Sequence, residues 1–262
     1  SIDDNDHQKA DIRMHENDFF NEDLLCALAG VAGEDNVLMS EPMREHTTFK
    51  IGGPAAFWCT PRDAEQLRRT LQLCRENGVR VYLLGNGSNT LFDDTGFDGA
   101  VIDMRGLSGM ENSGLDTDVV RITAGAGQTL GRLCSKAQTL GLTGLEFACG
   151  IPGTVGGAVY MNAGAYGNEL KDVLESVTFL DSDLQLRTLP AADLAMGYRT
   201  SIFEQNPDWC ILSATVCCTA VTEPPCWPVC RSCWASAGKS SPLNGRAPAA
   251  PSSGPRARLR AS

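Results

Sequence analysis

A glycine-rich segment, residues 144–167, carries the strongest chemical signal in the chain. It holds seven glycines in 24 positions, one carboxylate (Glu146) and neither lysine nor arginine. Glycine loses the most backbone entropy on folding, so this density needs a reason. The usual reason is the close approach of backbone N–H groups to a large anion such as a dinucleotide pyrophosphate. The alternative is a tightly turned sheet corner in which glycine serves packing alone.

A second turn of small residues, 85–89, has the sequence Gly-Asn-Gly-Ser-Asn and follows the apolar run 79–84, which predicts a buried strand. In α/β folds, a turn of this kind after a strand is where phosphates bind. Residues 125–131 follow a GxGxxxG pattern and lead into a helix predicted to end before Gly141. That pattern alone has little specificity.

The remaining chain predicts a mixture of helices and strands. Apolar spacing predicts helices over 18–32 and over 63–78, the second with Gly78 as its C-cap. Short apolar or alternating runs predict strands over 47–55, 101–104, 119–124, 177–180, 184–189 and 211–216.

Bulk composition excludes several classes of protein. The 262 residues carry a formal charge of −10, which argues against general nucleic-acid binding. Residues 1–18 form an acidic, polar run that resembles neither a signal peptide nor a membrane anchor. No run of 18 apolar residues occurs, so a membrane-spanning helix is not expected. We expect a soluble, cytoplasmic protein.

The composition changes abruptly after Val216. Residues 217–262 hold six basic residues and one acid, a net charge of +5, whereas the first 216 residues hold 16 basic and 31 acidic residues, a net of −15. The same 46 residues contain five of the eleven cysteines and seven of the thirteen prolines. This difference in charge and composition indicates that residues 217–262 are a different class of sequence from the first 216 and not merely a loop.

Four segments, read together, carry a family resemblance. They are Thr-Thr-Phe-Lys-Ile-Gly-Gly at 47–53, Leu-Gly-Asn-Gly-Ser-Asn at 84–89, the loops 150–157 and 162–167 within the glycine-rich segment, and Gly-Tyr-Arg-Thr-Ser-Ile-Phe at 197–203. In this order and spacing, over roughly residues 40–216, the chain resembles the UDP-N-acetylenolpyruvoylglucosamine reductases, the flavoenzymes of peptidoglycan synthesis, and their shorter bacterial subtype in particular.

The resemblance implies an α+β fold with a two-lobed FAD-binding domain of the p-cresol methylhydroxylase and vanillyl-alcohol oxidase type. It implies an acidic segment and helix over 1–40, one lobe over 41–115 and a second over 116–216, with FAD in the cleft between them. The residues expected to present amides and small side chains to the FAD phosphates are Gly85, Asn86, Gly87, Ser88, Asn89, Gly150, Ile151, Pro152, Gly153, Thr154, Gly156 and Gly157.

The resemblance also implies a reaction, in which NADPH reduces the enolpyruvyl group of a UDP-sugar through FAD. Hydride attack leaves negative charge on an enolate, so a fixed cation and a proton donor are needed. Arg199 matches the family's catalytic arginine, and its guanidinium binds a carboxylate without losing its proton. Tyr198, Asn162 and Tyr166 are expected near the UDP-sugar, although a packing role fits each of them almost as well.

No metal site is expected. The three histidines, His7, His15 and His46, are too scattered for a metal centre or a catalytic triad. Cys134 and Cys149 are expected to be small buried hydrophobic residues.

The resemblance ends after Val216, where the family's substrate domain should follow. That domain supplies a catalytic serine within an Ala-Gly-Ser-x-Phe-Lys-Arg-Pro motif and a later glutamate, and this chain shows neither. A zinc knuckle built from Cys226, Cys230 and Cys233 would lack a second ligand pair. A disordered, proline- and arginine-rich extension is another interpretation.

A third interpretation is a slip of the reading frame. Permissible codons for residues 240–256, read two bases later, translate as Gln-Pro-Leu-Glu-Trp-Pro-Gly-Ala-Gly-Ser-Thr-Phe-Lys-Arg-Pro-Glu-Gly. This translation contains the missing serine motif, and second codon bases leave little room for chance agreement over this length. We therefore expect residues 217–262 to be out of frame in place of a substrate domain, and to be disordered or poorly packed.

The out-of-frame hypothesis predicts little or no reductase activity for the chain as written. Two alternatives remain open at this point. One is a non-catalytic remnant that binds FAD, and the other is a different flavin oxidoreductase of the same superfamily. The oligomeric state is not evident from the residues.

Overall fold

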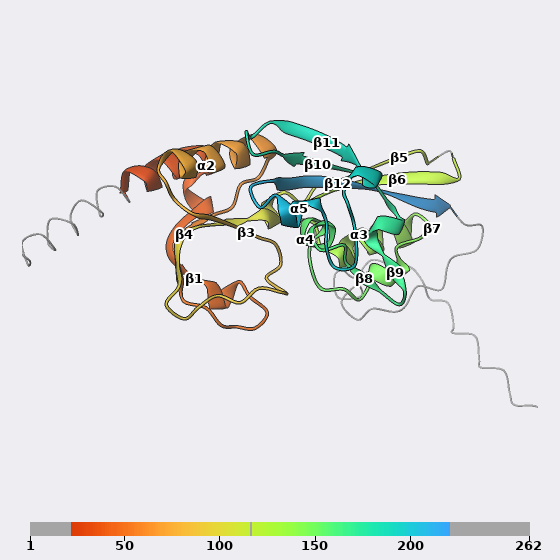
Figure 1. Cartoon of the computed structure of the whole chain (residues 1–262), viewed down its shortest axis with the longest axis horizontal. Helices are drawn as coiled ribbons and strands as arrows, with labels where there is room; N and C mark the ends of the chain where they lie inside the picture. The colour runs from red at the N-terminus through yellow and green to blue at the C-terminus, as the bar shows by residue number, and fades with distance from the viewer. Residues whose placement is uncertain (1–21, 116, 221–262) are drawn as a thin grey trace, which may run out of the picture.

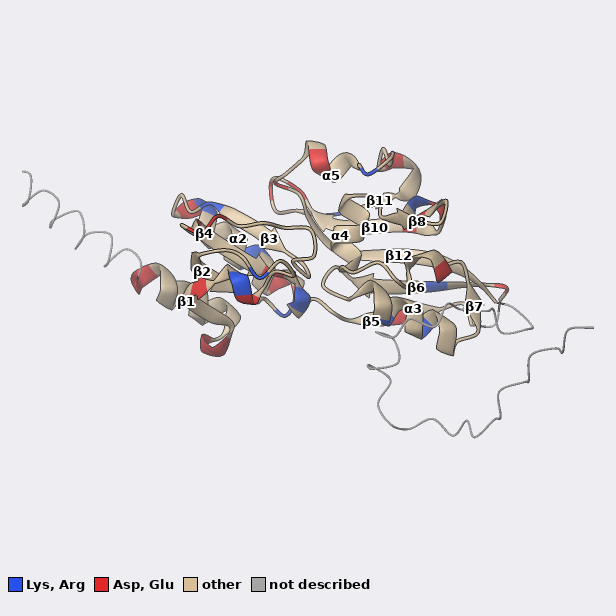
Figure 2. Cartoon of the chain, turned by 90° about the horizontal axis from the view of Figure 1, so that it is seen from below, with Lys and Arg blue, Asp and Glu red and all other residues tan. Residues whose placement is uncertain are grey.

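Two sheets of different kinds form two lobes that lie side by side (Figures 1 and 2). The computed structural model describes residues 22–115 and 117–220. The first sheet is mostly parallel and the second is antiparallel, as expected for an α+β chain.

The first lobe holds a four-stranded sheet in the order β1-β2-β4-β3, in which β2, β4 and β3 run parallel. Its strands are β1 (Val37–Pro42), β2 (Pro54–Cys59), β3 (Val81–Leu84) and β4 (Phe97–Asp103). Three 3₁₀ turns flank these strands: η1 (Glu34–Asn36) precedes β1, η2 (Met43–Glu45) follows β1 and η3 (Met104–Gly106) follows β4.

Two helices cover one face of this sheet. The helix over 22–32 buries Leu24, Leu28 and Ala32, which recur every four residues. The second is α2 (Ala64–Glu76), whose N-terminus is capped by the carboxylate of Asp63 accepting from Gln66 N at 2.8 Å. The sequence therefore predicted both helices, and the capping residue explains where α2 begins.

The second lobe is a six-stranded antiparallel sheet in the order β11-β10-β12-β6-β5, with β7 paired to the end of β12. Its strands are β5 (Met110–Ser113), β6 (Val119–Gly125), β7 (Leu142–Thr143), β10 (Leu174–Leu180), β11 (Leu186–Pro190) and β12 (Cys210–Ala220). Its helices are α3 (Leu130–Thr139), α4 (Val155–Tyr160) and α5 (Ile202–Gln205), with the short turns η4 (Glu146–Ala148), η5 (Leu170–Asp172) and η6 (Ala191–Asp193). A small hairpin pairs β8 (Gly164–Ala165) with β9 (Asn168–Glu169).

One apolar core joins the two lobes. Leu67 of α2 and Ile102 at the end of β4 are fully buried and belong to the same cluster as the residues between the second sheet and helices α3 and α4. The loop that begins at Met104 carries the chain from one sheet to the other within this cluster. The lobes are therefore packed against each other through side chains of the first lobe.

The lobe boundaries expected from the sequence need correction. The first sheet begins at Val37, not at residue 41. The boundary expected at 115/116 lies between Asp103 and Met110, because β5 pairs with β6 of the second sheet. β5 is a polar edge strand whose side chains alternate between half-buried and exposed, so no apolar pattern marks it.

The strand predicted over 47–55 is wrong as well. Residues 47–53 form an irregular loop, and the strand β2 begins only at Pro54. Lys50 has a φ of 56° and Gly52 a φ of 132°, so the backbone leaves the extended region twice within the loop.

The strand β12 also continues beyond Val216. Residues 217–220 extend β12 alongside β6, with Cys218 opposite Val120 and only 2% exposed. The alternation of buried residues through Ala214, Val216 and Cys218 carries the strand across the predicted boundary. The remainder of the expected tail, residues 221–262, lies outside the described residues.

We predict that this extension contributes to stability. A Cys218→Asp substitution should lower the free energy of unfolding by about 3 kcal/mol, because it buries a charge without a partner. A Thr219→Asp substitution on the exposed side of the same strand end is the matched control and should change stability by less than about 0.5 kcal/mol. Urea unfolding measures the free energy of unfolding of both variants. An equally small change in the two would show that residues 217–220 add nothing to the stability of the sheet.

Candidate functional site

The turn 85–89 and the loop 150–157, which lie 64 residues apart where they touch, meet at the junction of the lobes. Ser88 Oγ donates a hydrogen bond to the Pro152 carbonyl at 3.0 Å. Gly85 lies so close to the loop that a Cβ there would be 2.5 Å from Thr154 Oγ1. The contact is made beyond the end of β3, at the carboxyl edge of the parallel strands, which is where open α/β sheets bind ligands.

Backbone amides are available on both sides of this contact. Six backbone amides donate no hydrogen bond to an acceptor within residues 22–115 and 117–220. They are those of Asn86, Gly87, Ser88, Asn89, Gly153 and Thr154. Successive free N–H groups in a turn form a concave anion-binding surface. The residues present therefore fit a dinucleotide pyrophosphate.

The glycines of the loop serve two different purposes. Gly156 packs, because a Cβ there would be 2.9 Å from the Cβ of Ala126, and its amide donates to the Ala126 carbonyl at 2.8 Å. Gly153 has a φ of 154° and only Ser88 Oγ near its Cβ position, at 3.7 Å. Gly150 has open space around it. Packing therefore explains Gly156, whereas Gly150 and Gly153 leave space that a ligand could approach.

The loop 47–53 is hydrogen-bonded to the turn 85–89. Thr48 donates to the Gly87 carbonyl through its amide at 3.0 Å and through its hydroxyl at 3.3 Å. Gly87 has a φ of 59°, and a Cβ there would be 2.1 Å from the His46 carbonyl oxygen. Only glycine fits such a position without moving the chain.

The expected catalytic arginine lies on a tight turn at 197–200. Gly197 N donates to the Thr200 carbonyl at 3.1 Å, and Arg199 has a left-handed φ of 57°. Arg199 Nη2 donates to the Gly164 carbonyl at 3.3 Å, so its guanidinium reaches the neighbouring β8–β9 hairpin. The adjacent Tyr198 is 84% exposed, which leaves its ring free to contact a ligand.

Asn162 connects this turn to the hairpin. Its Nδ2 donates to Glu169 Oε2 at 3.0 Å and to the Gly197 carbonyl at 2.8 Å, and its Oδ1 accepts from Lys171 N at 3.1 Å. The side chain is buried, with 1% of the residue exposed. Its position therefore supports a structural role for Asn162, which positions the two turns.

Tyr166 occupies the tip of the hairpin. It and Gly167 both have positive φ values, 56° and 86°, which is the type I′ geometry of a two-residue hairpin turn. The residue is 90% exposed. A tyrosine held in the left-handed region at full exposure gains little from packing.

The charge around Arg199 is balanced locally. The Lys171 ammonium, which pairs with Glu169, lowers the pKa of that carboxyl, and the Asn162 amide and the Arg199 guanidinium lower it further against the effect of burial. Glu169 is therefore an anion at neutral pH.

The short helix α4 separates the two halves of the site. Thr154 caps its start, accepting from Gly157 N at 3.4 Å, and Ser201 Oγ donates to the Tyr160 carbonyl at its end, at 2.6 Å. Six helical residues span about 9 Å. Ser201 is fully buried and positions the end of α4. Its place in the Tyr-Arg-Thr-Ser motif is the sequence signal for this role.

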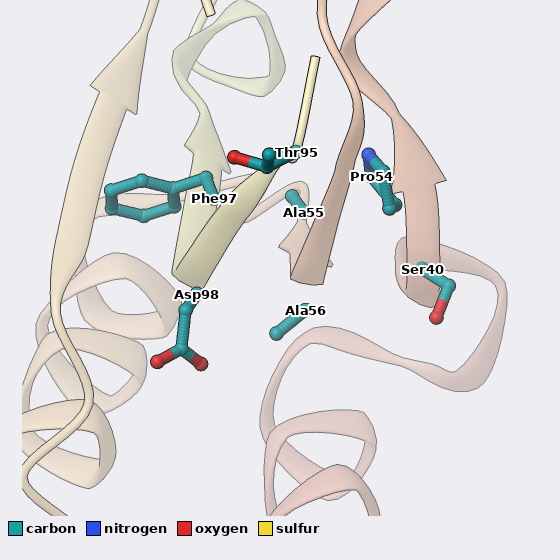
Figure 3. Close-up of a pocket in the computed structure, with 7 residues that line it drawn as sticks. All are labelled: Ser40, Pro54, Ala55, Ala56, Thr95, Phe97 and Asp98. Carbon is teal, nitrogen blue, oxygen red and sulfur yellow. The ribbon is translucent and has the colours of Figure 1, made fainter. Parts of the chain in front are cut away.

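Another hollow, of about 210 Å³, opens where β2 and β4 begin (Figure 3). It forms because the pairing of these strands shifts register between Ala55 and Phe57. Asp98, whose carboxylate is almost fully exposed, is its charged group. Since it lies at the amino ends of the parallel strands, opposite the turn 85–89, we do not include it in the site.

The described residues hold neither a metal-binding cluster nor a membrane-spanning helix. Within 22–115 and 117–220, no three His, Cys, Asp or Glu side chains gather where they could hold a metal ion. No helix in the same part of the chain is both long and apolar enough to cross a membrane.

Comparison with known proteins identifies the family of the chain. The family described as "FAD binding domain" matches residues 55–189. A UDP-N-acetylenolpyruvoylglucosamine reductase from Clostridium botulinum (strain 657 / Type Ba4) is 44% identical over 175 residues, which cover 67% of this chain and 56% of the relative. One from Geobacillus kaustophilus is 42% identical over 187 residues, covering 71% and 60%. The chain thus spans little more than half the length of these relatives.

Solved structures confirm the predicted fold class. The reductase (MurB) from Thermus caldophilus superposes with a TM-score of 0.56 at 30% identity, covering 71% of this chain and 62% of that one. p-Cresol methylhydroxylase superposes with a TM-score of 0.55 at 12% identity, covering 76% and 43%, which shows the shared fold alone.

We predict that Asn162 holds the two turns together. An Asn162→Asp substitution removes both amide donors and places a carboxylate against Glu169 and the Gly197 carbonyl, so it should cost about 2–3 kcal/mol. Amide hydrogen exchange should speed up over 164–169 and 197–200. Asn168→Asp at the exposed start of β9 is the control, and equal protection in both variants would contradict the role.

Proposed function

Since the chain belongs to the FAD-binding domain family, we propose that its two lobes hold FAD as part of a UDP-N-acetylenolpyruvoylglucosamine reductase. The observation that carries the proposal is the contact of the turn 85–89 with the loop 150–157, with free amides on both sides. The 40–44% identity to reductases of this name supports the assignment.

In this proposal the FAD phosphates bind the amides of residues 86–89, 153 and 154. Gly153 leaves room for the pyrophosphate, Gly85 allows Thr154 to approach the turn, and Ser88 and Pro152 tie the two segments together. The first lobe extends from β1 to β4 and the second from β5 to β12, with the cofactor across their junction.

Bound FAD would supply hydride transfer from NADPH to the enolpyruvyl group of the UDP-sugar, giving UDP-N-acetylmuramate for peptidoglycan in the cytoplasm. The contribution of this chain is Arg199, whose fixed cation meets the charge that develops on the substrate's carboxylate end. The hydrogen bond to Gly164 and the anionic Glu169 orient the guanidinium. Tyr198 and Tyr166, both exposed beside it, are the proposed contacts to the sugar nucleotide.

The proton donor of the reaction is missing from the chain as written. We place the slip of the reading frame after Cys218, where the alternation of β12 still holds, and not at Val216. Residues beyond it replace the substrate domain. A remnant that binds FAD without turnover is the second candidate, which the 40–44% identity to named reductases does not favour. Another flavin oxidoreductase is not favoured by the comparisons.

The first test is flavin binding. The full chain should bind FAD in a fluorescence titration, and Gly85→Ala should weaken binding at least about tenfold, because its Cβ forces Thr154 away from the turn. Gly109→Ala, in a loop with open space around the position, is the matched control and should bind like the wild type. Absence of binding by the wild-type chain would refute the proposed function.

The second test separates the enzyme from the remnant. The FAD-loaded chain should reduce the enolpyruvyl substrate about 10²–10⁴-fold more slowly than a complete reductase, which is the usual effect of losing a general acid. Sequencing the locus around codons 216–220 should show the shifted frame. Robust NADPH-dependent turnover by the chain as written, or codons that exclude the shifted translation, would contradict the frame slip.

A further inference from the structure

A cluster of charged and aromatic side chains lies behind the turn 85–89 without taking part in the site described above. The His46 ring stacks on Trp58 of β2 with centroids 3.8 Å apart and an interplanar angle of 27°. Its Nε2 lies 2.7 Å from Glu41 Oε1, on β1. On the other side, Arg105 Nη2 lies 3.4 Å from His46 Nδ1. Three sides of the ring are thus in contact with defined partners.

These partners assign the state of the ring. A guanidinium can only donate, so Nδ1 carries a lone pair toward Arg105. The Glu41 carboxylate can only accept, so Nε2 carries the hydrogen. The contacts therefore fit the tautomer that carries its hydrogen on Nε2.

Asp103 fixes the far end of the cluster. The residue is 5% exposed, and its carboxylate accepts from Arg105 Nε at 2.8 Å, from Nη2 at 3.0 Å and from the Arg105 amide at 3.0 Å. The fork of two bonds holds the guanidinium in one plane beside Trp58, whose ring centroid is 6.0 Å from Cζ. Asp103 is paired in register with Leu84, the residue before Gly85.

The backbone of His46 transmits this anchoring to the turn. Its carbonyl oxygen occupies the space that a side chain at Gly87 would need, 2.1 Å from the Cβ position. Two residues later, Thr48 donates twice to the Gly87 carbonyl. A displacement of His46 would therefore move the supports that hold Gly87 in its left-handed conformation.

We propose that His46, held by Glu41 and by the Arg105–Asp103 pair, is a positioning residue for the pyrophosphate-binding turn. The inference rests on the proposed function, since it concerns how that turn is held ready for a dinucleotide. The cluster keeps the amides of residues 86–89 in the arrangement that an anion requires. Binding therefore does not incur the entropy cost of ordering the turn.

The test compares FAD affinity with stability in the full-length chain. His46→Ala should weaken FAD binding about tenfold or more in a fluorescence titration, while the melting temperature of the apoprotein falls only slightly. His46→Gln should restore affinity to within about threefold, because its amide nitrogen can donate to Glu41 and its oxygen can accept from Arg105. A merely structural ring would show parallel losses of affinity and stability in both variants.

A matched pair of arginines provides the control. Arg105 and Arg80 both lie over an aromatic ring of the first sheet and beside an aspartate of β4, Asp103 at its end and Asp98 near its start. Arg105→Ala should weaken FAD binding, and Arg80→Ala, at the edge away from the turn, should not. This pair decides the matter if His46→Ala fails to fold.

The outcomes are distinct. Wild-type affinity in both His46→Ala and Arg105→Ala would overturn the inference and leave FAD binding intact. Equal losses in Arg105→Ala and Arg80→Ala would overturn it in favour of general destabilisation. No FAD binding by the wild-type chain would refute the proposed function and the inference with it.

Discussion

The close approach of two backbone segments, 85–89 from the first lobe and 150–157 from the second, is the constraint on which the rest of the site depends. It requires the absence of a side chain at Gly85 and a hydroxyl of the right length at Ser88. Because the segments belong to different lobes, their contact also sets how the lobes sit relative to each other. The shared core around Leu67 and Ile102 keeps that arrangement rigid.

Several residues with strained backbone conformations lie on the side of the site that holds Arg199. Seven described residues other than glycine have a positive φ, and three of these are Asn162, Tyr166 and Arg199. Such conformations cost free energy and persist where the surroundings over-determine them. Here the buried Asn162 amide makes the bonds that hold two of the strained turns, so a hydrogen-bonded polar group offsets local strain near the proposed chemistry.

Sequence reasoning succeeded where a local pattern decides the structure. The apolar spacing over 63–78 predicts α2, and the run at 119–124 predicts β6, since each depends on neighbours in the chain. The resemblance identified the fold class and the segments that meet in the site. Sequence patterns failed where contacts between residues distant in the chain determine the structure. The loop 47–53 alternates like a strand, yet its shape is set by Gly87 and by the segment near Asp94. The cluster around His46 was missed because its members come from separate elements and share no motif.

The position of β12 has a consequence for how the chain is made. This strand is the last described element of the second lobe, yet it lies inside the sheet, between β10 and β6, and its partner β6 was synthesised roughly a hundred residues earlier. Pairings of such high sequence separation form late. On a ribosome, the second lobe cannot close until residue 220 has emerged, and until then β6 and β10 lack their common neighbour. An error in translation before Cys210 would therefore deprive the sheet of its centre, whereas one after Ala220 leaves a lobe that can still complete itself.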